Sequence, residues 1–200
     1  GYPPTYVLAK LFMTTINTVG EARGDEVLAV VTELLNAASA TDEEFRARLV
    51  GRIYQENTDV ARFVLATLAE DAMTKETKVD LWRQEKNHFV WTIEHILPQG
   101  ENLPLAWQQM LGGEGVSAEV QEEHRHRLGN LTITAYNSNL GNKSFLEKRD
   151  RKDSKGRYIG YRNSLSLNAE LAARDSWTAN DIEERTQVLA DKAVERFPLG

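Results

Sequence analysis

The chain contains no cysteine, and it contains no long apolar run. Without cysteine it forms neither disulfide bonds nor thiolate zinc sites, which fits a reducing compartment. No stretch approaches the roughly 20 apolar residues of a membrane span, and no basic and then apolar segment opens the chain. We therefore expect a cytoplasmic protein that does not bind membranes.

Positive charge is also scarce, because 24 Lys and Arg residues face 30 Asp and Glu residues and the formal net charge is -6. This balance argues against a protein that coats nucleic acid along its whole surface. One segment differs: between residues 143 and 162, eight basic side chains stand against three acidic ones. The segment is a candidate contact for phosphate, although a solvated helix and loop would have the same composition.

A glycine-rich phosphate loop is missing as well. Gly112, Gly113 and Gly115 lie close together, but no Lys-Ser or Lys-Thr pair follows them. This segment therefore indicates a flexible turn and not a nucleotide site. The sequence opens at Gly1 without a methionine and enters a helix-like pattern at once. We expect this start to belong to a domain excised from a longer protein.

The first third of the chain has helical periodicity. Apolar residues recur at spacings of three and four over residues 5–73. Thr41 with Glu44 forms a capping-box signature, and Thr58 is placed to cap a further helix. No polar side chains converge in this part, so we expect residues 1–86 to form a helical bundle that serves as a scaffold.

The periodicity changes in the middle of the chain. Phe89, Trp91 and Ile93 alternate with their neighbours in the period-two pattern of a strand that ends at Pro98. A second run of this kind covers residues 131–134. The alternation predicts two short strands that are far apart in the sequence.

We expect residues 87–152 to form one small core around these strands. Residues 100–127 are a predicted insertion between the strands, with two helical pieces. Residues 137–152 have apolar side chains at helical spacing and predict a helix. The order of elements is therefore strand, long connection, strand and helix.

Residues 153–200 are expected to be a basic loop followed by a packing helix. Thr178 and Asp181 form a second capping-box signature, and Trp177 is placed to pack on Ile182. The predicted fold class is α+β and mainly α. A small strand–strand–helix core lies between an N-terminal helical bundle and a C-terminal helix.

Two short motifs carry residue types that chemistry uses. Residues 92–99 read Thr-Ile-Glu-His-Ile-Leu-Pro-Gln, and residues 128–134 read Leu-Gly-Asn-Leu-Thr-Ile-Thr. Four polar residues follow the second motif: Asn137, Asn139, Asn142 and Lys143. Taken separately, a Glu-His pair is an ordinary surface pair, and asparagines near a helix start are ordinary turn and cap residues.

Taken together, the order and spacing of these residues resemble the His-Asn-His (ββα-metal) nuclease superfamily. They are similar in particular to the C-terminal nuclease domain of the GmrSD-like family of modification-dependent restriction and anti-phage proteins. Residues 89–149 carry the resemblance. It implies a ββα-metal nuclease core, double-stranded DNA as substrate, and an N-terminal sensor domain of the parent chain as partner.

Chemistry and resemblance together assign roles to the motif residues. An imidazole that titrates near neutral pH accepts a proton from the attacking water, so His95 is the candidate general base. Glu94 offers a hard oxygen ligand of the kind that a single Mg²⁺ or Mn²⁺ ion prefers. By resemblance, Asn139 is the second metal ligand, either Asn139 or Asn142 stands in place of the superfamily's third histidine, and Asn130 braces the loop that carries His95. This replacement implies weak metal affinity.

The candidate substrate-binding residues are Asn142, Lys143, Lys148 and Arg149. His124 and His126 form a His-x-His pair that would bind a metal ion if both side chains pointed the same way. The predicted helix separates them by about 200°, so we expect no metal there. Arg125 and Arg127 beside them could approach DNA phosphates.

These assignments predict a Mg²⁺- or Mn²⁺-dependent endonuclease that nicks or cuts DNA, as the effector domain of a bacterial restriction or anti-phage protein. Two alternatives stay open. One is a DNA-binding or partner-docking module with a vestigial site. The other is a nuclease that acts on RNA, because the core contacts the phosphate backbone and its motif does not fix the sugar. We also expect weak, salt-dependent DNA binding by the isolated domain.

Overall fold

The computed structural model describes residues 5–20 and 22–198. Gly1, the expected start of an excised domain, lies outside these residues. The α-helices are α1 (Thr5–Val19), α2 (Asp25–Ala38), α3 (Asp42–Leu49), α4 (Ile53–Glu56), α5 (Thr58–Asp71), α6 (Leu105–Met110), α7 (Glu114–His124), α8 (Asn137–Leu140), α9 (Phe145–Arg149), α10 (Ala169–Ala173) and α11 (Ala179–Arg196). The other elements are the 3-10 helices η1 (Leu128–Asn130) and η2 (Ser166–Asn168) and the strands β1 (Gln84–Glu85), β2 (His88–Phe89), β3 (Thr92–His95) and β4 (Leu131–Thr134).

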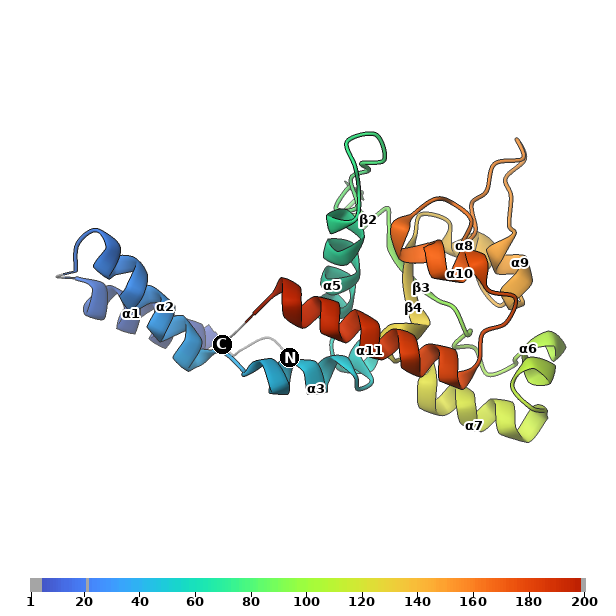
Figure 1. Cartoon of the computed structure of the whole chain (residues 1–200), viewed down its shortest axis with the longest axis horizontal. Helices are drawn as coiled ribbons and strands as arrows, with labels where there is room; N and C mark the ends of the chain where they lie inside the picture. The colour runs from blue at the N-terminus through green and yellow to red at the C-terminus, as the bar shows by residue number, and fades with distance from the viewer. Residues whose placement is uncertain (1–4, 21, 199–200) are drawn as a thin grey trace.

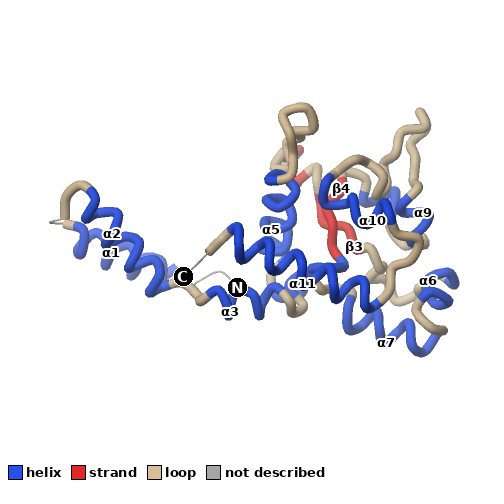
Figure 2. The backbone as a smooth tube through the Cα atoms, viewed as in Figure 1, coloured by secondary structure: helices blue, strands red, loops and turns tan. Residues whose placement is uncertain are grey.

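Helices dominate, and the strands form two two-stranded sheets, so the fold class is α+β and mainly α, as predicted. The β3–β4 pair lies at the centre of the larger body, with helices around it (Figure 2). Two clusters of buried apolar side chains surround the pair: one draws on α3, α5, β4 and α11, and the other on α6, α9 and Trp177. Among the described residues, no helix is long and apolar enough to cross a bilayer.

The predicted N-terminal bundle divides into two parts. Helices α1 and α2 pack against each other as a hairpin, and neither buries a side chain. In Figure 1 this hairpin extends away from the rest of the molecule. The expectation of a single bundle over residues 1–86 is therefore corrected, because only α3, α4 and α5 join the core of the body.

Helix α3 begins as predicted. The Thr41 side chain accepts from the backbone N–H of Glu44, and the Glu44 carboxylate accepts from the Thr41 N–H in return. The start of α5 was predicted one residue late: Asn57, and not Thr58, is the cap, and its side chain accepts from the Val60 N–H at 3.1 Å. Either residue type caps helices well, so local sequence did not decide between them.

Strands β3 and β4 pair in antiparallel fashion, and this sheet positions the candidate site. Glu94 lies opposite Thr132, and His95 lies opposite Leu131. All four residues of β4 are buried, so both faces of this strand are covered. The two sequence motifs, far apart in the chain, thus become neighbours across one ladder.

The single strand predicted around Phe89–Ile93 is two strands in the structure. β1 and β2 form a hairpin whose two-residue turn, Lys86 and Asn87, has positive φ angles of 50° and 63°. A turn with two positive φ angles matches the twist of paired strands. β3 then starts at Thr92 as a separate element.

The helix predicted over residues 137–152 is also divided. α8 ends at Leu140, and the next residue, Gly141, has a φ of 44°, a value that favours glycine. α9 starts afresh at Ser144, whose side chain caps it together with Glu147. The interruption places α9 so that its buried face meets the end of β3.

The C-terminal helix α11 begins as predicted. Thr178 and Asp181 form the capping box, and Trp177 and Ile182 are both fully buried in one cluster. The helix runs across the body and packs against η1. This contact makes it part of the support of the second motif.

Candidate active site

The end of strand β3 carries two buried polar side chains, Glu94 and His95, which are 3% and 6% exposed. Both line an open pocket. The other residues around this pocket are Tyr54, Ile93, Pro98, Gln99, Gly100, Asn137, Gly141 and Asn142. It therefore lies between the end of β3, the loop after it, and the segment around α8.

The His95 ring is held on one side and open on the other. Its Nε2 lies 3.4 Å from Nδ1 of His126, and the Tyr54 ring meets it edge-on with 4.5 Å between centroids. Nδ1 of His95 has no hydrogen-bond partner among the described residues, yet it is not a buried atom. Nδ1 is therefore the ring nitrogen that is accessible from outside.

The environment of His95 keeps its imidazole neutral. Burial lowers the pKa of His95 to about 3, and the nearby positive charges of Lys148 and Arg125, together with that of His126 when it is protonated, act in the same direction. Burial is the largest cause because it removes water from the charged form. The neutral ring is the form that accepts a proton.

Glu94 is fixed by Lys148, which reaches it from α9. The Lys148 ammonium donates to Oε1 of Glu94 at 2.6 Å, to the His95 carbonyl at 2.6 Å and to the Ile96 carbonyl at 3.1 Å. These three bonds use all three donors of the ammonium. Burial raises the pKa of Glu94 and lowers that of Lys148, and each charge opposes the shift of the other.

This arrangement does not fit the expectation that Lys148 contacts substrate. Its side chain is completely buried, and its donors are all occupied within the protein. The contacts assign Lys148 to holding the end of β3. Sequence alone could not show this, since a lysine four residues after a helix cap is usually exposed.

Asn130 joins the second motif to the loop after β3. Its side-chain oxygen accepts from the Leu97 N–H at 2.8 Å, and its side-chain nitrogen donates to the carbonyls of Leu97 and Arg125, each at 3.0 Å. The Trp177 indole N–H also donates to the oxygen, at 3.2 Å. Asn130 is fully buried, so it touches the protein and not the pocket.

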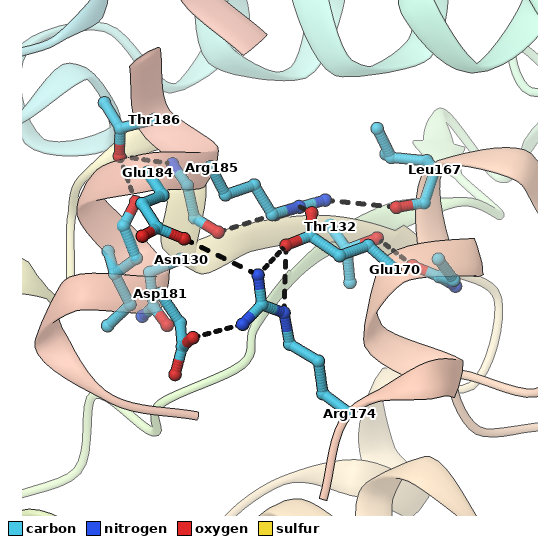
Figure 3. Close-up of polar contacts among 12 residues, drawn as sticks. Asn130, Thr132, Leu167, Glu170, Arg174, Asp181, Glu184, Arg185 and Thr186 are labelled. Carbon is cyan, nitrogen blue, oxygen red and sulfur yellow. Dashed lines mark hydrogen bonds and ion pairs between the residues drawn. The ribbon is translucent and has the colours of Figure 1, made fainter. Parts of the chain in front are cut away.

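Helix α11 clamps the same motif from the other side (Figure 3). Thr186 accepts from the Gly129 N–H at 3.0 Å, and the buried Arg185 donates to the carbonyls of Gly129 and Leu131 at 2.6 and 2.8 Å. Burial lowers the pKa of Arg185 to about 10. A side chain on Gly129 would overlap Ile182, since its Cβ would lie 2.0 Å from that carbonyl oxygen. This close approach explains the glycine of the motif.

The asparagines after β4 differ in position. Asn137 lines the pocket and donates to the Ile93 carbonyl at 2.7 Å. Asn142 also lines it and donates to the Asn102 carbonyl at 2.8 Å. Asn139, the candidate second metal ligand, is exposed and is not among the residues around the pocket. Its assignment as a ligand stays a prediction, and Asn137 and Asn142 are the two asparagines that line the pocket together with Glu94.

The other two basic candidates also differ from each other. Lys143 is half-buried, and its carbonyl accepts from the Trp107 indole N–H at 2.9 Å. Arg149 is buried, with its guanidinium paired to Asp150 and Asp175 at 2.7 and 2.5 Å. Because these pairs occupy it, the structure gives Arg149 a structural role in place of the expected substrate contact.

Two residues at the site were not predicted from the sequence: Tyr54 and His126. His126 lies just after α7, and its ring stacks on Tyr54 with 5.4 Å between centroids. Among the described residues, His124 makes no ring contact or hydrogen bond with this pair, and its Nε2 lies 3.7 Å from the Glu123 carboxylate. The position of His126 four residues before Asn130 was a usable signal, whereas nothing in the sequence marked Tyr54, which comes from the presumed scaffold.

The basic segment forms an exposed loop beyond α9. Lys152 pairs with Tyr158 as an isolated bridge, and its ammonium lies 4.5 Å from the Tyr158 ring centroid. Arg157 forms an ion pair with Asp153 at 2.6 Å. Arg151, Lys152 and Lys155 are exposed. The local positive charge predicted from the sequence is therefore displayed at the surface.

The donors at the pocket fit a hard divalent ion. Glu94 uses Oε1 for Lys148, while Oε2 has no hydrogen-bond partner and is not a buried atom. The Asn142 side chain borders the same space. Among the described residues, no three His, Cys, Asp or Glu side chains form a metal-binding group. An ion here would keep mainly water and phosphate ligands, as Mg²⁺ commonly does.

Comparison with protein families adds the decisive observation. A family model described as the C-terminal domain of GmrSD restriction endonucleases matches residues 39–192. The chain belongs to this family. The GmrSD match includes both motifs and every element from α3 to α10, and it begins after α2. Searches of curated proteins and of solved structures gave no match. The resemblance to the GmrSD-like C-terminal domain is thus confirmed, and it places the chain in a restriction-endonuclease family.

Proposed function

We propose that this GmrSD C-terminal domain is a metal-dependent DNA endonuclease with His95 as general base. One observation carries the proposal: Glu94 and His95 each have one polar atom fixed by the protein and one open outward. Lys148 holds Oε1 of Glu94, and His126 contacts Nε2 of His95. A metal ligand and a base need this combination of fixed orientation and access to substrate.

In this mechanism, Nδ1 of His95 takes a proton from a water molecule. The water oxygen attacks the phosphorus as the bond from phosphorus to the leaving oxygen breaks. A divalent ion held by Glu94, with Asn142 or Asn139 as a second ligand, would neutralise charge on the phosphate. Asn130 acts indirectly, because it fixes Leu97 in the loop directly after His95.

The basic loop supports DNA as the substrate. Arg151, Lys152 and Lys155 are exposed close in sequence to α9, which contacts the end of β3. Lysine and arginine supply the phosphate contacts that position a protein on DNA without reading its sequence. Lys143 and Asn142 lie at or beside the pocket and are the candidates for contact nearer the cleaved bond.

The test is cleavage of supercoiled plasmid with Mg²⁺, Mn²⁺ or EDTA. His95→Ala should lower the rate about 10²- to 10⁴-fold, the usual contribution of a positioned acid–base group. Glu94→Gln should also lower the rate, because it removes the charged ligand proposed for the metal ion. His88→Ala is the matched control, because His88 is an exposed histidine on β2. Undiminished cleavage by His95→Ala, or cleavage that persists in EDTA, would refute the mechanism.

The same proteins test the two alternatives, which are a nuclease that acts on RNA and a binding module without cleavage. An RNA substrate matched in sequence to the DNA shows which polymer is cut. DNA binding that survives both EDTA and His95→Ala, with no cleavage in any metal, would indicate a binding module instead.

A further inference from the structure

Arg125, His126 and His95 form a continuous chain of contacts that leads into the pocket. Nε of Arg125 points at Nε2 of His126 from 3.2 Å, and Nδ1 of His126 lies 3.4 Å from Nε2 of His95. The chain ends at Nδ1 of His95, which is open to the outside. Both ring nitrogens of His126 therefore face a neighbour, whereas only Nε2 of His95 does.

Hydrogen-bond rules fix the protons along this chain. The Arg125 guanidinium only donates, so Nε2 of His126 must accept and must carry no proton. A neutral His126 then has its proton on Nδ1 and donates to Nε2 of His95. A neutral His95 must in turn carry its proton on Nδ1, so it presents an N–H at its open side.

Removing the contact from Arg125 allows the opposite order. His126 is then free to carry its proton on Nε2 and to accept at Nδ1 from the Nε2–H of His95. In that arrangement Nδ1 of His95 has a lone pair at its open side. The two arrangements differ only in which atoms carry protons, and no ring has to move.

We infer that Arg125 and His126 set the tautomer of His95 and so decide whether it presents an N–H or a lone pair to the pocket. His126 is a positioning residue, and Arg125 acts through it. The consequence for catalysis rests on the proposed function, because only the lone-pair form acts as a base at Nδ1. The arrangement in the structure is thus a resting form.

The surroundings of Arg125 allow such a change. Its side chain is 26% exposed, and its second anchor is a 2.6 Å ion pair with Glu122. Arg52 approaches the same carboxylate at 3.2 Å, so Glu122 has a second cation when Arg125 leaves. A phosphate group of the substrate is an anion that would draw the guanidinium away from His126.

The experiment is nuclear magnetic resonance of protein labelled with ¹⁵N in its four histidines. The ring nitrogens of His95, assigned by their loss in His95→Gln, report directly which atom carries the proton. The wild-type protein should show the proton on Nδ1, and Arg125→Gln should move it to Nε2. Arg52→Gln is the matched control, because Arg52 contacts Glu122 but not His126, and it should resemble the wild type.

His126→Phe gives an independent check, since it keeps an aromatic ring beside Tyr54 but removes the contact to His95. It should leave His95 as a mixture of tautomers. The same tautomer in the wild type and Arg125→Gln, or a proton on Nε2 in the wild type, would overturn the inference. Unchanged signals of His88 and His124 show that each variant is folded.

Cleavage under single-turnover conditions at saturating DNA is the second readout. Arg125→Gln should increase the rate constant and Arg52→Gln should not, while an unchanged or lower rate in Arg125→Gln would count against the resting form. The tautomer measurement needs no cleavage, so failure of the nuclease proposal and failure of this inference are distinguishable.

Discussion

Helices α1–α2 and helices α3–α5 have the same spacing of apolar residues, but only the helices of the second group bury apolar side chains. In the hairpin, Tyr6 and Leu28 are 73% and 70% exposed, whereas Leu49 and Leu65 in the body are fully buried. Amphipathic spacing predicts a helix, but it does not say whether a partner covers the apolar face.

The family comparison also separates the α1–α2 hairpin from helices α3–α5. The GmrSD match begins at residue 39, directly after α2, and contains the whole candidate site. Tyr54 shows that α4, on the body side of this boundary, belongs to the site. The helical first third therefore contains one part that supports the site and one part that lies outside the matched domain.

The largest expected effect is in the buried ion pair of the body. Lys148→Met leaves the Glu94 carboxylate buried without its partner, so we expect a loss of about 3–5 kcal/mol in the free energy of unfolding. Denaturant titration measures it. The double variant Lys148→Met/Glu94→Gln should recover part of this stability without recovering cleavage. If Lys148→Met and the double variant were equally stable, an unpaired Glu94 would not be the cause of the loss, and the ion pair would not be what holds the end of β3.

A matched pair of leucines tests the comparison directly. Leu65→Ala removes a fully buried side chain from α5 and should cost about 2–5 kcal/mol. Leu28→Ala removes a side chain that is 70% exposed on α2 and should change stability by less than about 0.5 kcal/mol. Similar losses at both positions would mean that the face of the hairpin is covered in solution.

The body should also lose stability in mild acid because of His95. Its pKa is about 3 in the folded protein and near 6.5 when unfolded, so between these values only the unfolded chain binds the proton. Stability falls as pH falls through this window, by about 2 kcal/mol at pH 5 relative to pH 7.5. The pKa values of His124 and His126 are lowered too, so the His95→Gln variant is needed to isolate this share. A pH dependence that is the same in both proteins would contradict the buried, neutral His95.

The smallest effect is expected from removing the hairpin. Deletion of residues 1–38 should leave the melting temperature and plasmid cleavage of the body almost unchanged, because α1 and α2 bury no side chain. Calorimetry and the plasmid assay measure both. A large drop in either would show that the hairpin supports the body.

Much of the secondary structure followed from local signals. The capping boxes at Thr41 and Thr178 and the strand of the second motif were readable, because caps and turns depend on neighbouring residues. The divided helix after β4 was missed because Gly141 and Ser144 were treated as parts of a continuous apolar pattern. The prediction followed the apolar spacing, although a glycine and then a serine are residue types that often end one helix and begin the next.

The sequence by itself determined the family, the mainly helical fold class and the two motifs with Glu94, His95 and Asn130. Only the tertiary structure decided that Lys148 is a buried partner of Glu94, that His126 and Tyr54 contact His95, and that α1 and α2 remain uncovered. The physical reason is that caps and periodicity depend on residues a few positions apart. Burial and hydrogen bonding join residues as distant as Glu94 and Lys148, and no local pattern encodes such contacts.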